Sequence, residues 1–263
     1  MKYVVDHDYH IHSRLSSCSK DENHTPESIL QYAKRHGLKK ICLTDHFWDE
    51  TVPGASAWYQ KQDYAHICQA LPLPTDPDVE FVFGCEIDMD KFLTLGLAPE
   101  HFDRFGFVII PTTHLHMKNF TIDADATLAQ RADAYVKRLE RVLDMELPFH
   151  KIGIAHPTCP LMARDQWEDH LTVLDSIHDD TFTRLFTKAA QRGVGIELNF
   201  LVHDYTQQEL PRVLRPYRIA KKCGCKFYLG SDTHRVDEQE RGFANLHAMV
   251  DALALEEEDK FYF

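Results

Sequence analysis

The sequence has no long apolar run and no excess of positive charge. No uninterrupted apolar stretch approaches the roughly 18 residues that a membrane-spanning helix requires. The chain carries 29 Lys and Arg against 41 Asp and Glu, a formal net charge of −12 at pH 7. Non-specific binding to nucleic acid or to an anionic membrane surface needs basic residues. We therefore expect neither a nucleic acid nor a membrane as a partner.

Paired cysteine motifs are also missing. The seven cysteines include no CxxC pair, and Cys223 and Cys225 are too close in sequence to form a disulfide easily. An odd number of cysteines without a framework is typical of a reducing compartment. The start of the chain, MKYVVDHDYH, is acidic where a secretory signal peptide would be apolar. Together these features predict a cytoplasmic protein.

Short β-rich runs alternate with helical stretches along the chain, without an internal repeat. Strands are predicted at residues 3–7, 40–44, 80–85, 107–111, 151–155, 195–199 and 226–230. Helices are predicted at residues 26–36, 126–144, 179–191, 208–222 and 237–255. The segment 47–78, rich in Pro, Trp and Tyr, is predicted to be a long loop with a short helix inside. Strands that alternate with helices indicate an α/β fold with a parallel sheet, and we expect one domain over residues 1–263.

Histidine is abundant, with 17 copies, and polar motifs follow the predicted strands. These motifs are HIH at 10–12, TDH at 44–46, GCEID at 84–88, TTHLH at 112–116, AHP at 155–157 and GSDTH at 230–234. Residues i and i+2 of a strand face the same side, so His10 and His12 can bind one metal together. One HxH motif is weak evidence at this histidine frequency, but recurrence at strand ends is strong evidence. Strand ends meet at one mouth in a parallel barrel, and the pattern predicts a polynuclear metal site there.

The ordered motifs resemble those of the PHP (polymerase and histidinol phosphatase) family over residues 9–234. The resemblance implies a single distorted (β/α)7 TIM-like barrel with two or three divalent ions (Zn, Mn or Fe) at the C-terminal ends of its strands. The first metal would be held by His10, His12 and Asp232. Glu86 would bridge it to a second metal, completed by His114 and His156.

The third metal would be held by His46 and His234 together with the residue six places after His12. That residue is Cys18, where the family usually has His or Asp. A thiolate can bind zinc or another metal that accepts soft ligands. His24, in the same loop, is the alternative ligand. Asp45, next to His46, is expected to orient its neighbour through a hydrogen bond rather than to bind metal.

The resemblance implies hydrolysis of a small phosphorylated substrate by a hydroxide that bridges two metals. The residues expected to be catalytic are Glu86, Asp232 and His234, and Arg164 and Arg235 are candidates to bind the phosphate. A phosphomonoester is the expected substrate, with histidinol phosphate the best single candidate. A phosphodiesterase acting on small nucleotides or cyclic phosphates and an amidohydrolase-like C–N hydrolase are the alternatives. The sequence leaves the oligomeric state open.

Overall fold

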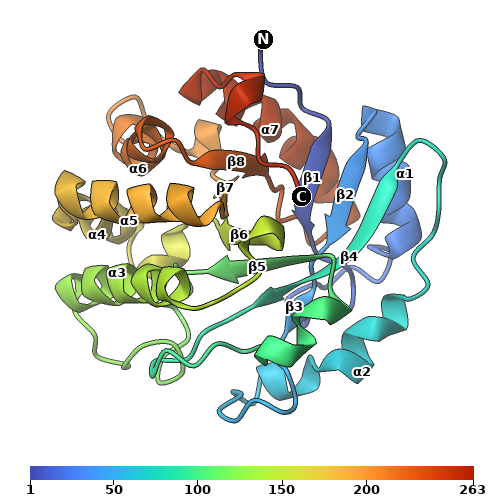
Figure 1. Ribbon diagram of the computed structural model, residues 1–263, viewed down its shortest axis with the longest axis horizontal. Coiled ribbons are helices and arrows are strands. Elements are labelled where there is room, and N and C mark those ends of the chain that lie inside the picture. The colour runs from blue at the N-terminus through green and yellow to red at the C-terminus, as the bar shows by residue number, and fades with distance from the viewer.

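In the computed structural model, which describes residues 1–263, parallel strands curl into a nearly closed barrel (Figure 1). The barrel strands, in their spatial order, are β1 (His7–Ile11), β2 (Lys40–Leu43), β4 (Glu80–Ile87), β5 (Phe107–Pro111), β6 (Ile152–Ala155), β7 (Gly195–Leu198) and β8 (Lys226–Leu229). A short strand, β3 (His46–Phe47), pairs with the end of β4 and sets His46 opposite Glu86. The predicted seven-stranded α/β barrel is thus confirmed.

The barrel closes only at the end where the strands finish. A parallel bridge joins Ile11 to Thr233, and the backbone N–H of Asp232 donates to the carbonyl of His10 at 2.7 Å. This seam lies directly beside the HIH and GSDTH motifs. The closure of the barrel therefore brings the two ends of the sequence pattern together.

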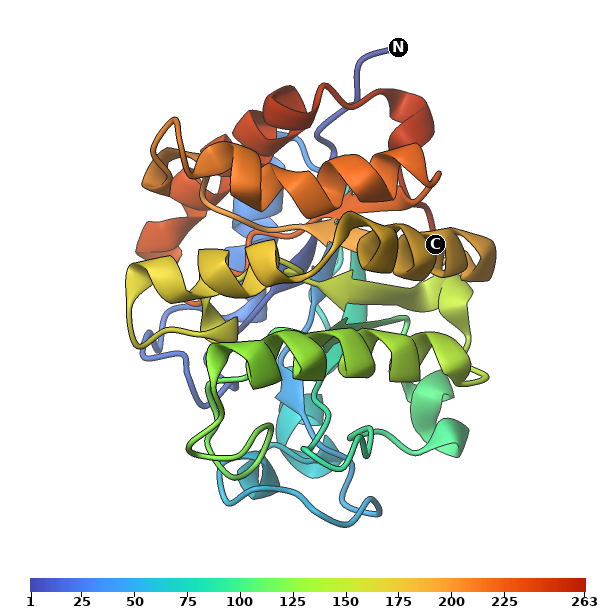
Figure 2. The ribbon, with the colours of Figure 1, turned by 90° about the vertical axis from the view of Figure 1, so that its left-hand side faces the viewer.

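Helices cover the outside of the barrel. They are α1 (Pro26–His36), α2 (Tyr64–Ile67), α3 (Leu128–Asp144), α4 (Trp167–Ser176), α5 (Asp179–Arg192), α6 (Leu210–Lys222) and α7 (Gln239–Leu253). Figure 2 shows α3, then α4 and α5 side by side at about one level, then α6 and α7, along one side of the molecule. The α1 helix begins after its N-cap Thr25 and ends at Gly37, whose positive φ of 67° suits glycine. None of the helices combines the length and apolar character needed to cross a membrane.

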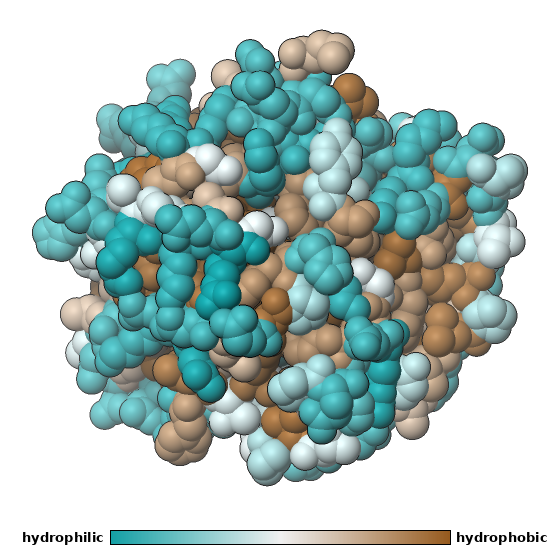
Figure 3. Space-filling model, viewed as in Figure 1, coloured by the Kyte–Doolittle hydropathy of each residue, from teal (hydrophilic) through white to brown (hydrophobic).

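Aromatic side chains fill the end of the barrel opposite the seam. Phe261 lies in a buried cluster with Tyr9, Phe107 and Tyr228, and the ring of Phe263 stacks on Phe107 with centroids 4.4 Å apart. The C-terminus accordingly lies within the circle of strands in Figure 1. Figure 3 shows mainly hydrophilic residues on this face of the molecule, with hydrophobic ones scattered among them. The barrel therefore has a packed apolar base and leaves its other end for polar residues.

Two expectations about the elements were wrong. The first strand is His7–Ile11 rather than residues 3–7, because the polar residues of HDYHI are buried inside the barrel while Val4 is exposed. The helix α4 (Trp167–Ser176) was not predicted, and it lies between β6 and α5 in the chain. The strand β3 was not predicted either, and α2 is the short helix expected inside residues 47–78. The other strands and helices begin and end within two residues of their predicted bounds.

We expect Phe261→Ala to lower the free energy of unfolding by about 3–5 kcal/mol, because it leaves a cavity among packed rings. Its neighbour Tyr262 is 64% exposed and provides the control. Tyr262→Ala should cost less than about 1 kcal/mol, the loss of one hydrogen bond at the surface. Chemical denaturation of both variants measures the difference. Equal effects at the two positions would show that the aromatic base does not stabilise the barrel.

Candidate metal centre

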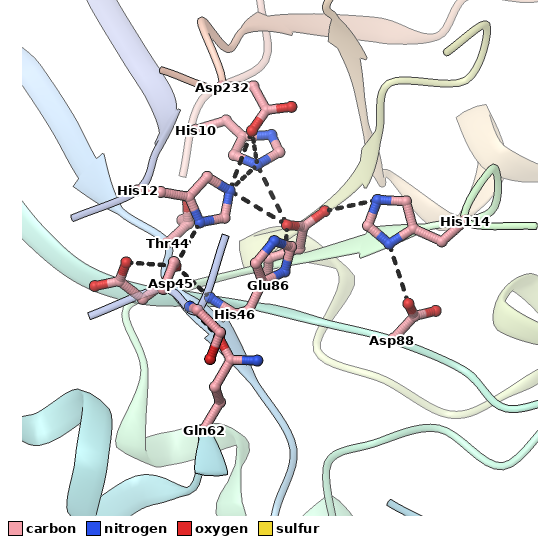
Figure 4. A network of polar contacts seen from close by, with 12 residues as sticks. His10, His12, Thr44, Asp45, His46, Gln62, Glu86, Asp88, His114 and Asp232 are labelled. Carbon is pink, nitrogen blue, oxygen red and sulfur yellow. Dashed lines mark hydrogen bonds and ion pairs between the residues drawn. The ribbon is translucent and has the colours of Figure 1, made fainter. Parts of the chain in front are cut away.

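Glu86 lies at the centre of a ring of imidazoles contributed by different strands (Figure 4). Its Oε2 atom is 2.9 Å from His46 Nδ1 and 3.3 Å from His12 Nε2. Its Oε1 atom is 3.2 Å from His156 Nε2 and 3.7 Å from His114 Nε2. The carboxylate is 1% exposed. Oε2 also lies 3.6 Å from His10 Nε2. The two oxygens therefore face separate sets of imidazoles, the arrangement expected of a carboxylate between two cations.

Asp232 and His234 form the open rim of this ring. Asp232 Oδ1 is 3.1 Å from His12 Nε2 and 3.3 Å from His10 Nε2. The His234 ring stacks on that of His12 with centroids 4.2 Å apart. The side chains of Asp232 and His234 are 28% and 24% exposed, whereas His10 and His12 are fully buried. Both rim residues line a cavity of about 500 Å³, through which a small molecule can reach the ring.

A hydrogen-bonded chain behind His12 fixes the proton of its imidazole. The hydroxyl of Ser16 donates to Asp45 Oδ1 at 2.7 Å and lies 2.9 Å from His12 Nδ1. Because its one proton goes to Asp45, Ser16 must accept from Nδ1, so Nε2 is the atom that His12 directs at Glu86, where a metal would take the place of its proton. Asp45 makes no hydrogen bond to the side chain of His46; it acts through Ser16, whose oxygen also accepts from the backbone N–H of His46 at 3.1 Å.

Four more imidazoles are held from behind at Nδ1. The partners of His10, His114, His156 and His234 are, in this order, the Glu197 carboxylate, the Asp88 carboxylate, the Thr113 hydroxyl and the Asp232 carbonyl, at distances of 2.7, 3.0, 2.8 and 2.8 Å. An acceptor on the far nitrogen of the ring is the usual surrounding of a metal-binding histidine. In each of these five imidazoles, Nδ1 thus has a hydrogen-bond partner and Nε2 is available for a metal.

The charges of the ring are those of a site that attracts cations. Burial alone would raise the pKa of Glu86, but the nearby His46 and His10 imidazoles lower it well below its usual value. Burial lowers the pKa of His12, but its hydrogen bonds to Asp232 and Glu86 raise it to about 9. Burial and the charge of His12 lower the pKa of His234 to about 3, so that ring is neutral at physiological pH. A bound cation would replace the proton of His12 as the partner of these carboxylates.

The donor set fits divalent metal ions. Four groups of three donors have atoms within 4.8 Å of one another and could hold a metal: His12, His46 and His234; His10, His12 and Glu86; His10, His156 and Glu197; and Glu86, His114 and His156. The buried Nδ1 atom of His46 makes no hydrogen bond although it faces Glu86. Imidazole and carboxylate donors of this kind suit zinc, manganese and iron.

The remaining candidate residues lie around the rim. Cys18 lies in the wall of the cavity, where part of the residue is exposed. The protein around its thiol keeps water away, and together with the charges of Asp232 and Glu86 this raises the pKa of the thiol. His24 is buried with its Nε2 atom 3.1 Å from the Gln239 amide, and it belongs to none of the four donor groups. Cys18 is also outside these groups, so its role as a ligand stays a prediction.

The two arginines predicted to bind phosphate differ in their surroundings. Arg235 lines the cavity, and its guanidinium forms two hydrogen bonds of 2.8 Å with Asp237. Arg164 is exposed. The pKa of His116 is lowered to about 3, chiefly by burial and by the charge of His114, and the charge of Arg164 adds to this effect. Arg235 thus borders the cavity, whereas Arg164 lies near His116.

The sequence analysis missed two buried carboxylates behind the ring. Glu197 contacts His10, and Asp88 contacts His114 and accepts from Arg138 at 2.6 Å. A signal was present in both places, because an acidic residue inside an apolar strand such as GIEL rarely becomes fully buried without a partner. Asp88 also follows Glu86 by two residues, the spacing that keeps side chains on one face of a strand.

The family model of the PHP domain matches residues 8–200 of this chain, and the chain belongs to this family. Together with the donor groups, this supports a metal-dependent hydrolase. A comparison with curated proteins gives no match.

Among solved structures, the fold is similar to a histidinol phosphate phosphatase from Lactococcus lactis complexed with zinc, L-histidinol and phosphate. The identity is 16% and the TM-score 0.62, over 98% of this chain and 99% of that chain. A probable 2-pyrone-4,6-dicarboxylic acid hydrolase from Acinetobacter baumannii with citric acid bound has 13% identity and a TM-score of 0.46, over 97% of both chains.

If Cys18 holds a third metal, Cys18→Ser should lose about one metal ion per chain, because a serine hydroxyl stays protonated at neutral pH whereas a metal-bound thiol does not. Cys18→Asp should restore occupancy, since carboxylate is also a ligand. Elemental analysis of the purified proteins gives the metal content. An unchanged content in Cys18→Ser, with a loss in His24→Ala, would assign the ligand to His24 instead.

Proposed function

We propose that this protein is a metal-dependent phosphoesterase that hydrolyses a small phosphomonoester, with histidinol phosphate as the best single substrate. The observation that carries the proposal is the position of Glu86, whose two oxygens face separate sets of imidazoles below an open cavity. Membership of the PHP family supports the same chemistry. The zinc and phosphate complex of the structurally similar phosphatase suggests the substrate class.

In this proposal the donor ring holds two or three ions. His10, His12 and Asp232 would hold the first, and Glu86 would share it with a second that His114 and His156 complete. His46 and His234 would hold the third, with Cys18. Divalent ions bound there would supply Lewis acidity and a water that ionises near neutral pH.

The chain itself binds and orients the substrate. The cavity beside Asp232 and His234 is lined mainly by polar and charged residues, which suits a small polar alcohol attached to the phosphate. Lys20, Arg235 and Arg241 lie in its wall and would attract the anionic substrate toward the ring. Because His234 is neutral, it is suited to ligation, and the buried ring below it keeps the reacting phosphate away from bulk solvent. All seven cysteines are free, which supports a reducing compartment such as the cytoplasm.

Chelation should abolish hydrolysis of an aryl phosphate, and added zinc or manganese should restore it, because a metal-bound water ionises near neutral pH whereas free water does not. Initial rates on a panel of phosphomonoesters, including histidinol phosphate, then rank the substrates. Cyclic and dinucleotide phosphodiesters and simple amides in the same panel distinguish the two alternative activities. Full activity of metal-free protein would contradict the proposal.

Glu86→Gln should lower turnover by more than about 100-fold. Loss of a residue that only hydrogen-bonds to a metal ligand already lowers activity by up to about 100-fold, and Glu86 is proposed to be a ligand itself. The amide removes the negative charge between the proposed ions and leaves the charge of these buried ions less compensated, which costs about 3–5 kcal/mol in the metal-bound form. Glu80→Gln is the matched control, because Glu80 is an exposed residue at the start of the same strand. Metal content, turnover and thermal unfolding of both variants are the measurements. Near-normal turnover with two tightly bound metals in Glu86→Gln would refute the bridging role.

A further inference from the structure

We infer that Glu197 is a positioning residue that prepares two metal-binding histidines, His10 and His156, at the same time. The inference rests on the proposed function, because it concerns how the donors of that site are oriented. Glu197 is fully buried on β7. Its Oε1 atom accepts from His10 Nδ1 at 2.7 Å, and its Oε2 atom accepts from the backbone N–H of His156 at 2.5 Å. Each oxygen therefore has one donor.

The contact with His156 supports a strained backbone. His156 has a φ of 27°, in the left-handed region that residues other than glycine rarely adopt. Thr113 holds the same residue from the other side, at Nδ1 and at the carbonyl oxygen. Strain of this kind persists only where the surroundings determine the conformation. Glu197 and Thr113 together keep His156 Nε2 directed at Glu86.

Glu197 reaches His10 because the chain leaves space for it at the end of β8. Gly230 directly follows β8, the strand that lies between β7 and β1 in the order of the barrel. A Cβ atom at Gly230 would overlap Glu197 Oε1 and would lie 2.6 Å from His10 Cβ. Only glycine permits this approach, so Gly230, the first residue of the GSDTH motif, leaves the space that the Glu197 carboxylate occupies behind the metal centre.

The only charged partner of the buried Glu197 carboxylate is a histidine of the proposed metal centre. Its only ion-pair partner is His10, and no lysine or arginine contacts it. A buried carboxylate without a compensating charge destabilises a fold. The location of this charge behind a metal-binding imidazole, where it increases the basicity of the ring, indicates a role in metal binding rather than in folding.

Replacement by glutamine should reverse the proton position on His10. The backbone N–H of His156 can only donate, so in Glu197→Gln it takes the carbonyl oxygen of the new amide and turns the NH2 group toward His10. Two donors cannot face each other, so Nδ1 must become the acceptor and the proton moves to Nε2. That atom is the one directed at Asp232 and His12. A protonated Nε2 cannot bind a metal.

The test compares wild-type protein, Glu197→Gln, Glu197→Asp and the exposed control Glu80→Gln. Zinc affinities are measured by competition with a chromophoric chelator, and zinc content by elemental analysis. We expect one zinc ion to bind about 10–100-fold more weakly in Glu197→Gln, an intermediate loss in Glu197→Asp, and no change in the control. The melting temperature of metal-free Glu197→Gln should equal or exceed that of wild type, while the gain on adding zinc should shrink.

The outcomes separate this inference from the proposed function. Wild-type protein that binds no metal would contradict the proposed function itself. Wild-type binding with unchanged affinities in Glu197→Gln, or an equal loss of stability with and without zinc, would overturn the role of Glu197. If the variant does not fold, ¹⁵N spectra of histidine in zinc-loaded wild-type protein give the answer. A proton on His10 Nδ1 supports the inference, and a proton on Nε2 refutes it.

Discussion

The centre depends on one constraint, which is that each imidazole around Glu86 must keep its proton on the nitrogen that points away. A neutral imidazole has one donor and one acceptor, and the acceptor has to face a metal. The protein meets this requirement with groups of different chemistry: carboxylates behind His10 and His114, hydroxyls behind His12 and His156. The placement of these supporting groups explains much of the buried polarity of the barrel.

A parallel barrel suits this arrangement, because neighbouring strands finish at one edge and each can supply a ligand or the group behind it. The short strand β3 sets His46 beside Glu86, and the seam between β1 and β8 sets Asp232 beside His10 and His12. The aromatic base closes the opposite end. Apolar packing and polar chemistry are thus separated along the barrel axis, and each can be satisfied without disturbing the other.

The fold and most of the donor ring could be predicted from the sequence, because strands alternated with helices and a polar motif followed nearly every strand. The position of β1 could not, since its buried residues are polar and the apolar run before it is partly exposed. Glu197 was also missed, because its partner His10 is 187 residues away and no local pattern connects them. Whether Cys18 or His24 completes the rim depends on loop conformation, which the spacing of residues does not determine.

The donors of the ring are spread over nearly the whole chain, from His10 to His234. His10 and His12 belong to β1 and the residue just after it, whereas Asp232 and His234 follow β8. During synthesis on the ribosome, the ring therefore stays incomplete until His234 has been joined and has left the exit tunnel. Metal acquisition then becomes a late event in the maturation of this protein, and the early histidines must wait in a partly folded chain where any soft or borderline ion in the cell can compete for them.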